Sequence, residues 1–164
     1  MTAASQVPPA DQLGPSERAV RRVRRPVIIG AWCFVTLGTA HLFVMVGSIA
    51  VGPAVATEEA LDAMRLAESS LLGIDRNMAA MYYGFSAVMA LLAISYGLLN
   101  LAVVRLAPAL LFSRKLPVIN LITAVCSLGV AALAFPLTAI AMLGIAVAAF
   151  AWALIVNTSH RRPK

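Results

Sequence analysis

A single histidine, His41, lies in the otherwise apolar run TLGTAHLFVMVGS of residues 36–48. An imidazole can transfer a proton, ligate a metal ion or form hydrogen bonds through both ring nitrogens. Because apolar surroundings disfavour its charged form, we expect a neutral ring that donates one hydrogen bond and accepts another. Its expected partners are Tyr82, Ser86 and Ser127. His41 is thus the candidate catalytic residue, while a structural role between helices stays open.

Two asparagines, Asn100 and Asn120, lie near the ends of separate apolar runs at a similar expected depth. A hydrogen bond between their side chains would contribute about 1 kcal/mol and fix the pairing of two helices. Asn157, followed by Thr-Ser-His, is interpreted as a helix end and not as a site. The candidate ligand-binding residues are His41, Tyr82, Ser86, Asn100, Asn120 and Ser127.

Metal and cofactor chemistry has little support in this sequence. Met45 follows His41 by four residues, a spacing that would suit a soft metal, but methionine is also an ordinary core filler. A b-type haem usually needs two axial ligands, and His41 is the one histidine within an apolar run. Cys33 and Cys126 form no CxxC motif. We therefore expect no metal and no cofactor.

The elements that position these residues must be membrane-spanning helices. The chain has 164 residues, of which 61% are hydrophobic and 12% are charged, and its mean hydropathy is +0.88. Soluble domains carry about 25% charged residues. Each apolar run is close to the roughly 20 residues that cross a bilayer as a helix. The predicted fold is all-α, a bundle of four transmembrane helices over about 27–51, 78–104, 117–135 and 137–157.

Several boundaries follow from this prediction. Pro136 is expected to separate the last two spans as a tight helical hairpin. Residues 1–25 are expected to form a flexible basic tail, residues 26–158 the transmembrane domain and residues 159–164 a second basic tail. The motif Ala-Val-Ala at 54–56 resembles a signal cleavage site, but the preceding run is longer than the 7–15 residues of a signal peptide. We expect the first span to be retained.

The segment between the first two spans, residues 57–73, is predicted to be a short amphipathic helix. Thr57 is a suitable N-cap and Gly73 a suitable residue just beyond the C-terminus. An apolar stripe of Leu61, Met64, Ala67 and Leu71 would rest on the bundle, either as a lid or as plain loop cover.

Small and polar residues at spacings of three and four predict which face of each span turns inward. On the first span this face carries Gly30, Phe34, Leu37, His41, Val44 and Ser48. On the last it carries Thr138, Ala141, Ile145, Ala148 and Trp152. No acidic or basic residue lies centrally in any span, so a charged ion pathway or proton relay is unsupported.

With its HLFVMVGS segment and MYYGFSAVMALLAISYGLLNL at 81–101, the chain resembles small four-helix bacterial membrane proteins of unassigned function. It is also loosely similar to the DoxX-like group in size and span layout. The resemblance implies four spans and no particular activity.

Three functions are compatible with these residues. The leading one is non-catalytic: binding of an apolar ligand or lipid, or service as an accessory subunit of a membrane complex. The second is a membrane-integral isomerase or cyclase that uses His41 as general acid or base. A transporter is disfavoured because internal repeats and discontinuous helices are not evident. The expected partners are the lipid bilayer, a lipophilic small molecule, and a membrane protein or second copy of the chain, with nucleic acid excluded.

The distribution of basic residues predicts a cell-membrane protein with both termini in the cytoplasm. Eleven Lys and Arg residues fall in the two tails and the middle loop, against two, Arg65 and Arg76, in the segment after the first span. By the positive-inside rule, the basic side is cytoplasmic. Reporter fusions at residue 65, residue 110 and the C-terminus should therefore read outside, inside and inside. An outside C-terminus would contradict this topology.

Overall fold

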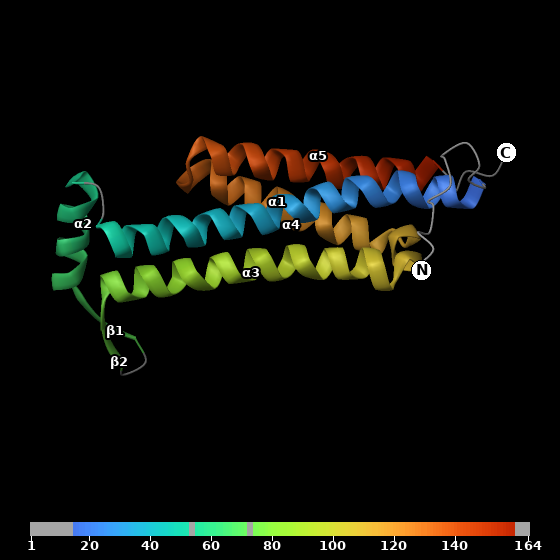
Figure 1. Ribbon diagram of the computed structural model, residues 1–164. Helices are drawn as coiled ribbons and strands as arrows, with labels where there is room; N and C mark the ends of the chain where they lie inside the picture. Colours follow the sequence, from blue (N-terminus) through green and yellow to red (C-terminus); the bar gives the residue numbers. More distant parts are fainter. Residues whose placement is uncertain (1–14, 53–54, 72–73, 160–164) are drawn as a thin grey trace, which may run out of the picture. The chain divides into compact units, whose positions relative to one another are not determined.

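The structure, a computed structural model, describes residues 15–52, 55–71 and 74–159. Its helices are α1 (Pro15–Val51), α2 (Val55–Leu66), α3 (Met78–Leu106), the 3-10 helix η1 (Pro108–Phe112), α4 (Lys115–Ala134) and α5 (Leu137–Ser159) (Figure 1). Four of them, α1, α3, α4 and α5, are long and apolar enough to cross a membrane. The predicted all-α class with four spanning helices and a short helix after the first is confirmed.

The first helix is longer than the predicted span. It begins at Pro15, so residues 15–25, expected as part of a flexible tail, are helical. The helix also continues through Pro26. Proline is tolerated in spanning helices when neighbouring groups satisfy the backbone that it leaves unpaired. Residues 1–14 and 160–164 of the expected tails lie outside the described residues.

The chain divides into two units. The terminal unit comprises Met1–Cys33 and Leu99–Lys164, and the central unit comprises Phe34–Leu98. Because α1 and α3 each cross a unit boundary in sequence, both helices contribute residues to both units.

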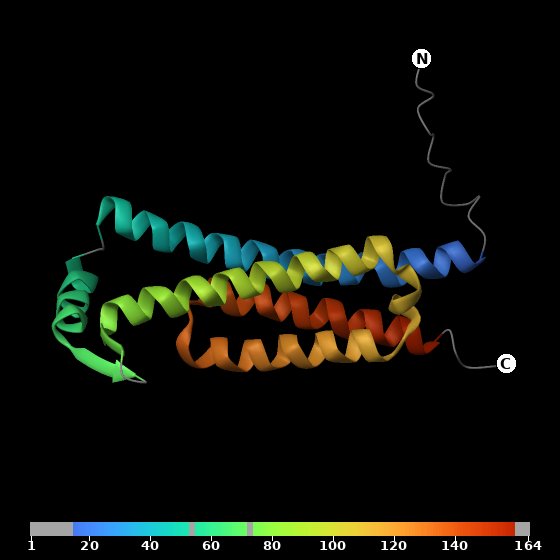
Figure 2. The same cartoon turned by 90° about the horizontal axis from the view of Figure 1, so that it is seen from below.

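In the terminal unit, α4 and α5 form the predicted hairpin and lie side by side (Figure 2). Pro136 separates them, and its carbonyl accepts hydrogen bonds from the backbone N–H groups of Ala139 at 3.0 Å and Ile140 at 3.4 Å. Phe135 is extended, with φ −119° and ψ 157°, as the residue before a proline usually is. The proline therefore ends one helix and supplies the first acceptor of the next.

The predicted inward face of α5 is wrong. Its members Ile145 and Trp152 are 50% and 59% exposed, and Thr138, Ala141 and Ala148 are exposed too. The buried face instead carries Ala139, Leu143, Ala146, Ala149, Phe150, Ala153 and Asn157. Phe150 is fully buried and lies so close to Gly30 that a Cβ there would be 2.6 Å from its ring. Small residues on α5 thus surround one large aromatic side chain.

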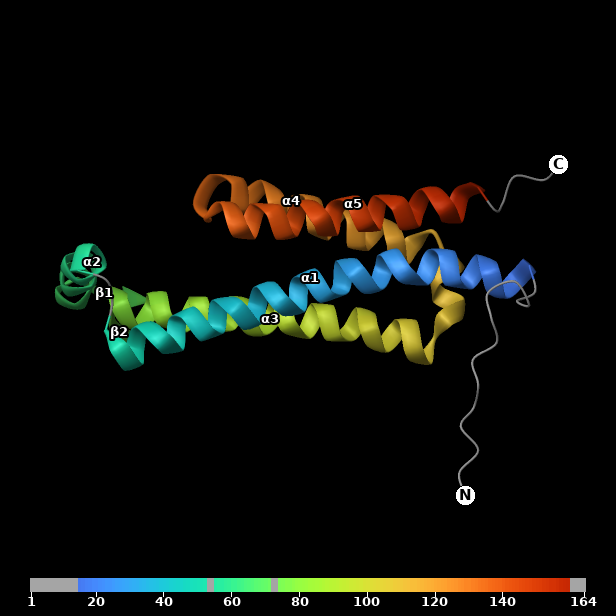
Figure 3. The same ribbon diagram turned by 45° about the horizontal axis from the view of Figure 1, so that its top comes forward.

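In the central unit, the second half of α1 runs beside α3 (Figure 3). Their closest approach is at Gly38, where an added Cβ would lie 2.6 Å from the backbone oxygen of Ala90. Phe34 and Tyr96 pack edge to face with ring centroids 4.8 Å apart. A glycine and an aromatic pair therefore fix the contact between these two helices.

The segment after α1 differs from its prediction. Gly52, at φ +89°, follows the end of α1, as glycine often does beyond a helix end. α2 begins at Val55, so Thr57 lies inside the helix and is not its N-cap. It ends at Leu66, and an antiparallel hairpin of β1 (Glu68–Leu71) and β2 (Ile74–Asn77) takes the place of its predicted last turns. Gly73, the predicted residue beyond the helix end, is not among the described residues.

The hairpin leads directly into α3. Asn77, the last residue of β2, accepts a hydrogen bond at Oδ1 from the backbone N–H of Ala80 at 2.7 Å. This is the geometry of an N-cap, which satisfies one of the free N–H groups of a helix start. Asn77 thereby sets where the second spanning helix begins.

The contact at Gly38 generates a stability prediction. Gly38→Ala should lower the free energy of unfolding by about 1–3 kcal/mol, because the new methyl group must push the Ala90 backbone away. The measurement is thermal unfolding of the detergent-purified protein. Gly47→Ala is the matched control, since it lies on the same helix with no atom within 4 Å of the added Cβ. The control should be neutral or up to about 1 kcal/mol more stable, and equal losses in both variants would contradict the close contact.

Candidate functional site

A cavity of about 470 Å³ lies within the central unit, between α1, α2 and α3. Each helix supplies one face to it. From α1 come His41, Val44, Met45 and Ser48; from α2 come Thr57, Ala60, Leu61 and Met64; and from α3 come Tyr82, Tyr83 and Ser86. On α1 and α2 the lining residues follow the spacing i, i+3, i+4, i+7, which places them on a single helix face. The volume falls within the roughly 300–1,000 Å³ typical of small-molecule sites.

The short helix α2 closes one end of this cavity. It lies across the ends of α1 and α3 (Figure 1). Leu61 is 4% exposed and Met64 is half-buried, whereas the other side of the helix carries exposed charges, including the ion pair of Arg65 with Asp62 at 2.6 Å. The amphipathic character predicted from the sequence thus turns apolar residues toward the cavity and charged residues away from it.

His41 is half-buried and lines the cavity. Tyr82 and Ser86 line the same cavity. Three of the six predicted site residues are therefore brought together. The hydrogen bonds predicted from the imidazole are not found, since its ring nitrogens have no partner among the described residues. The Ser48 hydroxyl donates a hydrogen bond to the backbone oxygen of Met45 at 2.8 Å. Tyr82 and Tyr83 pack edge to face with ring centroids 5.5 Å apart. The imidazole therefore keeps its hydrogen-bonding capacity at the cavity.

The lining is chemically simple. It combines apolar side chains with hydroxyl groups and one imidazole, and no Asp or Glu is among its eleven described residues. No cluster of three or more His, Cys, Asp or Glu side chains that would suit a metal ion occurs in the described part of the chain. Such a lining offers neutral hydrogen bonds in an apolar space.

The remaining predicted residues belong to the terminal unit. Asn120 donates from Nδ2 to Oδ1 of Asn100 at 2.6 Å, which confirms the predicted pairing of α3 with α4. Both asparagines are buried, at 1% and 3% exposure. Ser127 is half-buried on α4. The two asparagines hold helices together and do not line the cavity of the central unit.

Asn157 is a correction to the sequence interpretation. It is 2% exposed and donates from Nδ2 to the backbone oxygen of Leu111 in η1 at 3.2 Å. Leu111 is itself fully buried. A buried carbonyl in a short 3-10 turn needs a donor, and Asn157 supplies it. It is a buried contact, not merely the end of a helix.

The predicted ligand-binding residues did not include the other eight lining residues, Val44, Met45, Ser48, Thr57, Ala60, Leu61, Met64 and Tyr83. The signal for the α2 members was present in their spacing, but the stripe was drawn through Ala67 and Leu71 because the helix was expected to extend to residue 73. Tyr83 is adjacent to the predicted residue Tyr82 and lines the cavity with it. A stripe ending at Met64 would have found the face.

Comparison of the chain with protein-family models, curated proteins and solved structures finds no match in any of the three. The resemblance to the DoxX-like group is untested by these comparisons and stays a prediction.

The asparagine pair can be tested by a double-mutant cycle. Asn100→Ala and Asn120→Ala should each destabilise the protein, but the double variant should lose less than the sum by about 0.6–1 kcal/mol, because the shared hydrogen bond is lost only once. The measurement is unfolding of the detergent-purified variants. Replacing Asn100 and the half-buried Ser127 provides the control cycle and should be additive. Additivity in the asparagine cycle would contradict the bond.

Proposed function

We propose that this protein is a cell-membrane protein, with both termini in the cytoplasm, whose central unit binds a lipophilic small molecule in the cavity beneath α2. The observation that carries the proposal is the lining itself. Eleven residues from three helices line about 470 Å³, a volume suited to a small ligand and far below that of a whole phospholipid molecule with its two acyl chains.

The polar groups of the cavity support a ligand with a neutral polar end. His41, Ser86 and the tyrosine hydroxyls can donate or accept hydrogen bonds. Because no carboxylate lines the space, a cationic ligand would find no compensating charge there. A hydroxyl or carbonyl group attached to an apolar body complements this set, since a few polar groups would orient it while Val44, Leu61 and Met64 cover the remainder.

The enzyme alternative depends on the same histidine. A general acid or base needs only one titratable group within reach of its substrate, and His41 meets that requirement. The described lining holds no Asp or Glu that would orient the ring or balance its charge. Binding without turnover therefore has the stronger support. Service as an accessory subunit is the outcome favoured if no specific molecule is retained.

The experiment is mass spectrometry of lipophilic molecules that copurify with the protein in mild detergent. One small lipophilic species should be enriched over the bulk phospholipids. Ala60→Trp should reduce its stoichiometry at least fivefold, because Ala60 lines the cavity and the indole would fill it. Ala63→Trp is the matched control, since Ala63 is exposed on the same helix and outside the lining. Bulk phospholipid alone in the unmodified protein would contradict the proposal.

Two substitutions of His41 then separate its roles. His41→Gln keeps hydrogen bonding without proton transfer and should retain the ligand. His41→Leu removes both and should weaken binding about fivefold, the equivalent of one lost hydrogen bond. If the Gln variant folds and binds but the bound molecule changes chemically relative to the unmodified protein, the enzyme alternative gains support.

A further inference from the structure

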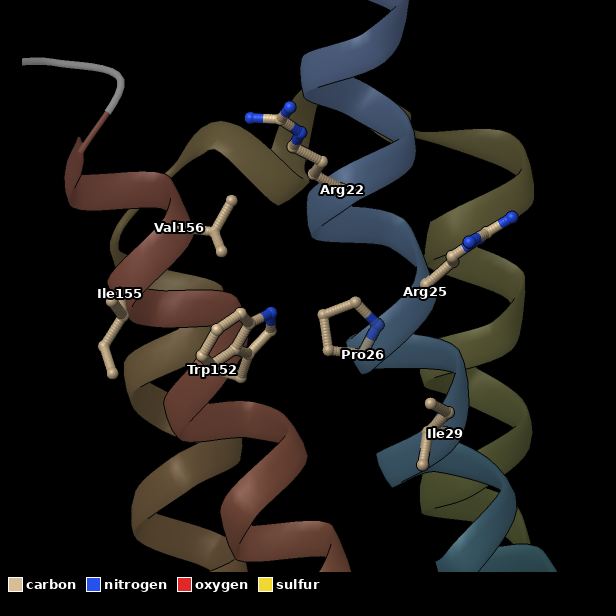
Figure 4. Close-up of a pocket in the computed structure, with 7 residues that line it drawn as sticks. All are labelled: Arg22, Arg25, Pro26, Ile29, Trp152, Ile155 and Val156. Atoms are coloured by element: carbon tan, nitrogen blue, oxygen red, sulfur yellow. The ribbon is translucent and has the colours of Figure 1, made fainter. Parts of the chain in front are cut away.

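A second hollow lies in the terminal unit, between the first half of α1 and the last turns of α5 (Figure 4). Its volume is about 700 Å³. On α1, residues 22, 25, 26 and 29 line it, and on α5, residues 152, 155 and 156 do. Both sets follow helical spacing, so each helix presents one face. We refer to this hollow as the arginine groove.

One end of the groove carries positive charge. Arg22 and Arg25 are both exposed, and neither forms an ion pair with any described residue. In the described part of the terminal unit, the one acidic residue is Glu17 in the first turn of α1. Figure 4 shows the Arg22 guanidinium above the gap between the two helices, whereas Arg25 extends from α1 away from α5. No acidic residue lines the groove.

Below the arginines, the groove is apolar. Ile29, Trp152 and Ile155 are 52%, 59% and 57% exposed, and all three belong to helices of spanning length. Arg22 and Ile29 are seven residues apart, about 10 Å along a helix. That distance leads from the headgroup level into the hydrocarbon. Trp152, with an apolar ring and one N–H donor, is the residue type that prefers this boundary.

Pro26 adds an acceptor at the same level. Proline has no backbone N–H, so the carbonyl of Arg22, four residues earlier, lacks its helical donor. A hydroxyl-bearing headgroup can donate to that oxygen while its phosphate meets the guanidinium. Along its length the groove thus offers positive charge for a phosphate, an acceptor for a headgroup hydroxyl and an apolar wall for an acyl chain.

We propose that the arginine groove binds an anionic phospholipid, with the phosphate at Arg22, an acyl chain along Ile29, Trp152 and Ile155, and Arg25 adding positive charge at the headgroup level. Charge complementarity selects an anion, and the apolar wall within a spanning segment selects one that carries acyl chains. The site lies wholly in the terminal unit and is independent of the ligand proposed for the central unit.

Fluorescence of Trp152 provides the test. Trp32→Phe leaves Trp152 as the one tryptophan of the full chain. The protein is placed in vesicles that contain increasing fractions of brominated phosphatidylglycerol or brominated phosphatidylcholine, and quenching is measured. The anionic lipid should quench Trp152 at an effective affinity at least fivefold higher than the zwitterionic lipid. Removing both charges with Arg22→Gln/Arg25→Gln should abolish this preference.

The matched control is Arg21→Gln/Arg24→Gln, which removes the same charge from neighbouring positions outside the groove. It should retain the preference. Equal quenching by both lipids in the Trp32→Phe protein would overturn the proposal without any substitution in the groove. An equal loss of the preference for the anionic lipid in both double variants would also overturn the proposal, because it would indicate general attraction to the membrane surface. Inorganic phosphate should relieve quenching no more than a chloride salt of equal ionic strength, and specific relief would assign the site to the free anion.

Discussion

Lipid offers no hydrogen bonds, so every backbone N–H and C=O within a spanning segment must find its partner inside the protein. The four apolar helices meet this demand internally, and the points where helical pairing fails show what else is needed. The carbonyl of Pro136 pairs with the first turn of α5. The carbonyl of Leu111, buried in the 3-10 turn before α4, receives the side chain of Asn157. A buried asparagine near the end of α5 thus follows from a backbone demand.

The same constraint separates the polar residues of the two units by role. In the terminal unit, the buried side chains of Asn100 and Asn120 bond to each other, and Asn157 bonds to a backbone carbonyl, so these groups serve the packing of helices. In the central unit, His41 and Ser86 face a cavity with a mostly apolar lining. Polar groups that line a space rather than pair with one another are those that a bound molecule can use, and this contrast supports the ligand proposal.

Acidic residues are unevenly distributed between the two units. Five acidic residues, Glu58, Glu59, Asp62, Glu68 and Asp75, belong to the central unit, whereas the described terminal unit has one, Glu17 near the start of α1. No carboxylate lines the groove beside Arg22 and Arg25. In a membrane protein, the headgroup layer is a near source of an anion for these two arginines.

The sequence by itself determined the all-α class, the number of spanning helices and most of their ends. The length and hydropathy of a segment are local properties, and they decide whether it can cross the bilayer. It also determined the asparagine pair, since two polar residues at equal depth in apolar helices have few other partners. The expected depth and the polarity of the two side chains were sufficient to predict this pair.

Only the tertiary structure decided which faces turn inward and which residues share a cavity. On α5, almost every position is small or apolar, so periodicity could not distinguish the face of Phe150 from that of Trp152; the close fit of Phe150 at Gly30 decides it. α2 ends at Leu66 because the chain turns into a hairpin there, which places Thr57 and Ala60 beside His41 in the cavity lining. Such choices depend on contacts between segments distant in the sequence, and no local pattern contains them.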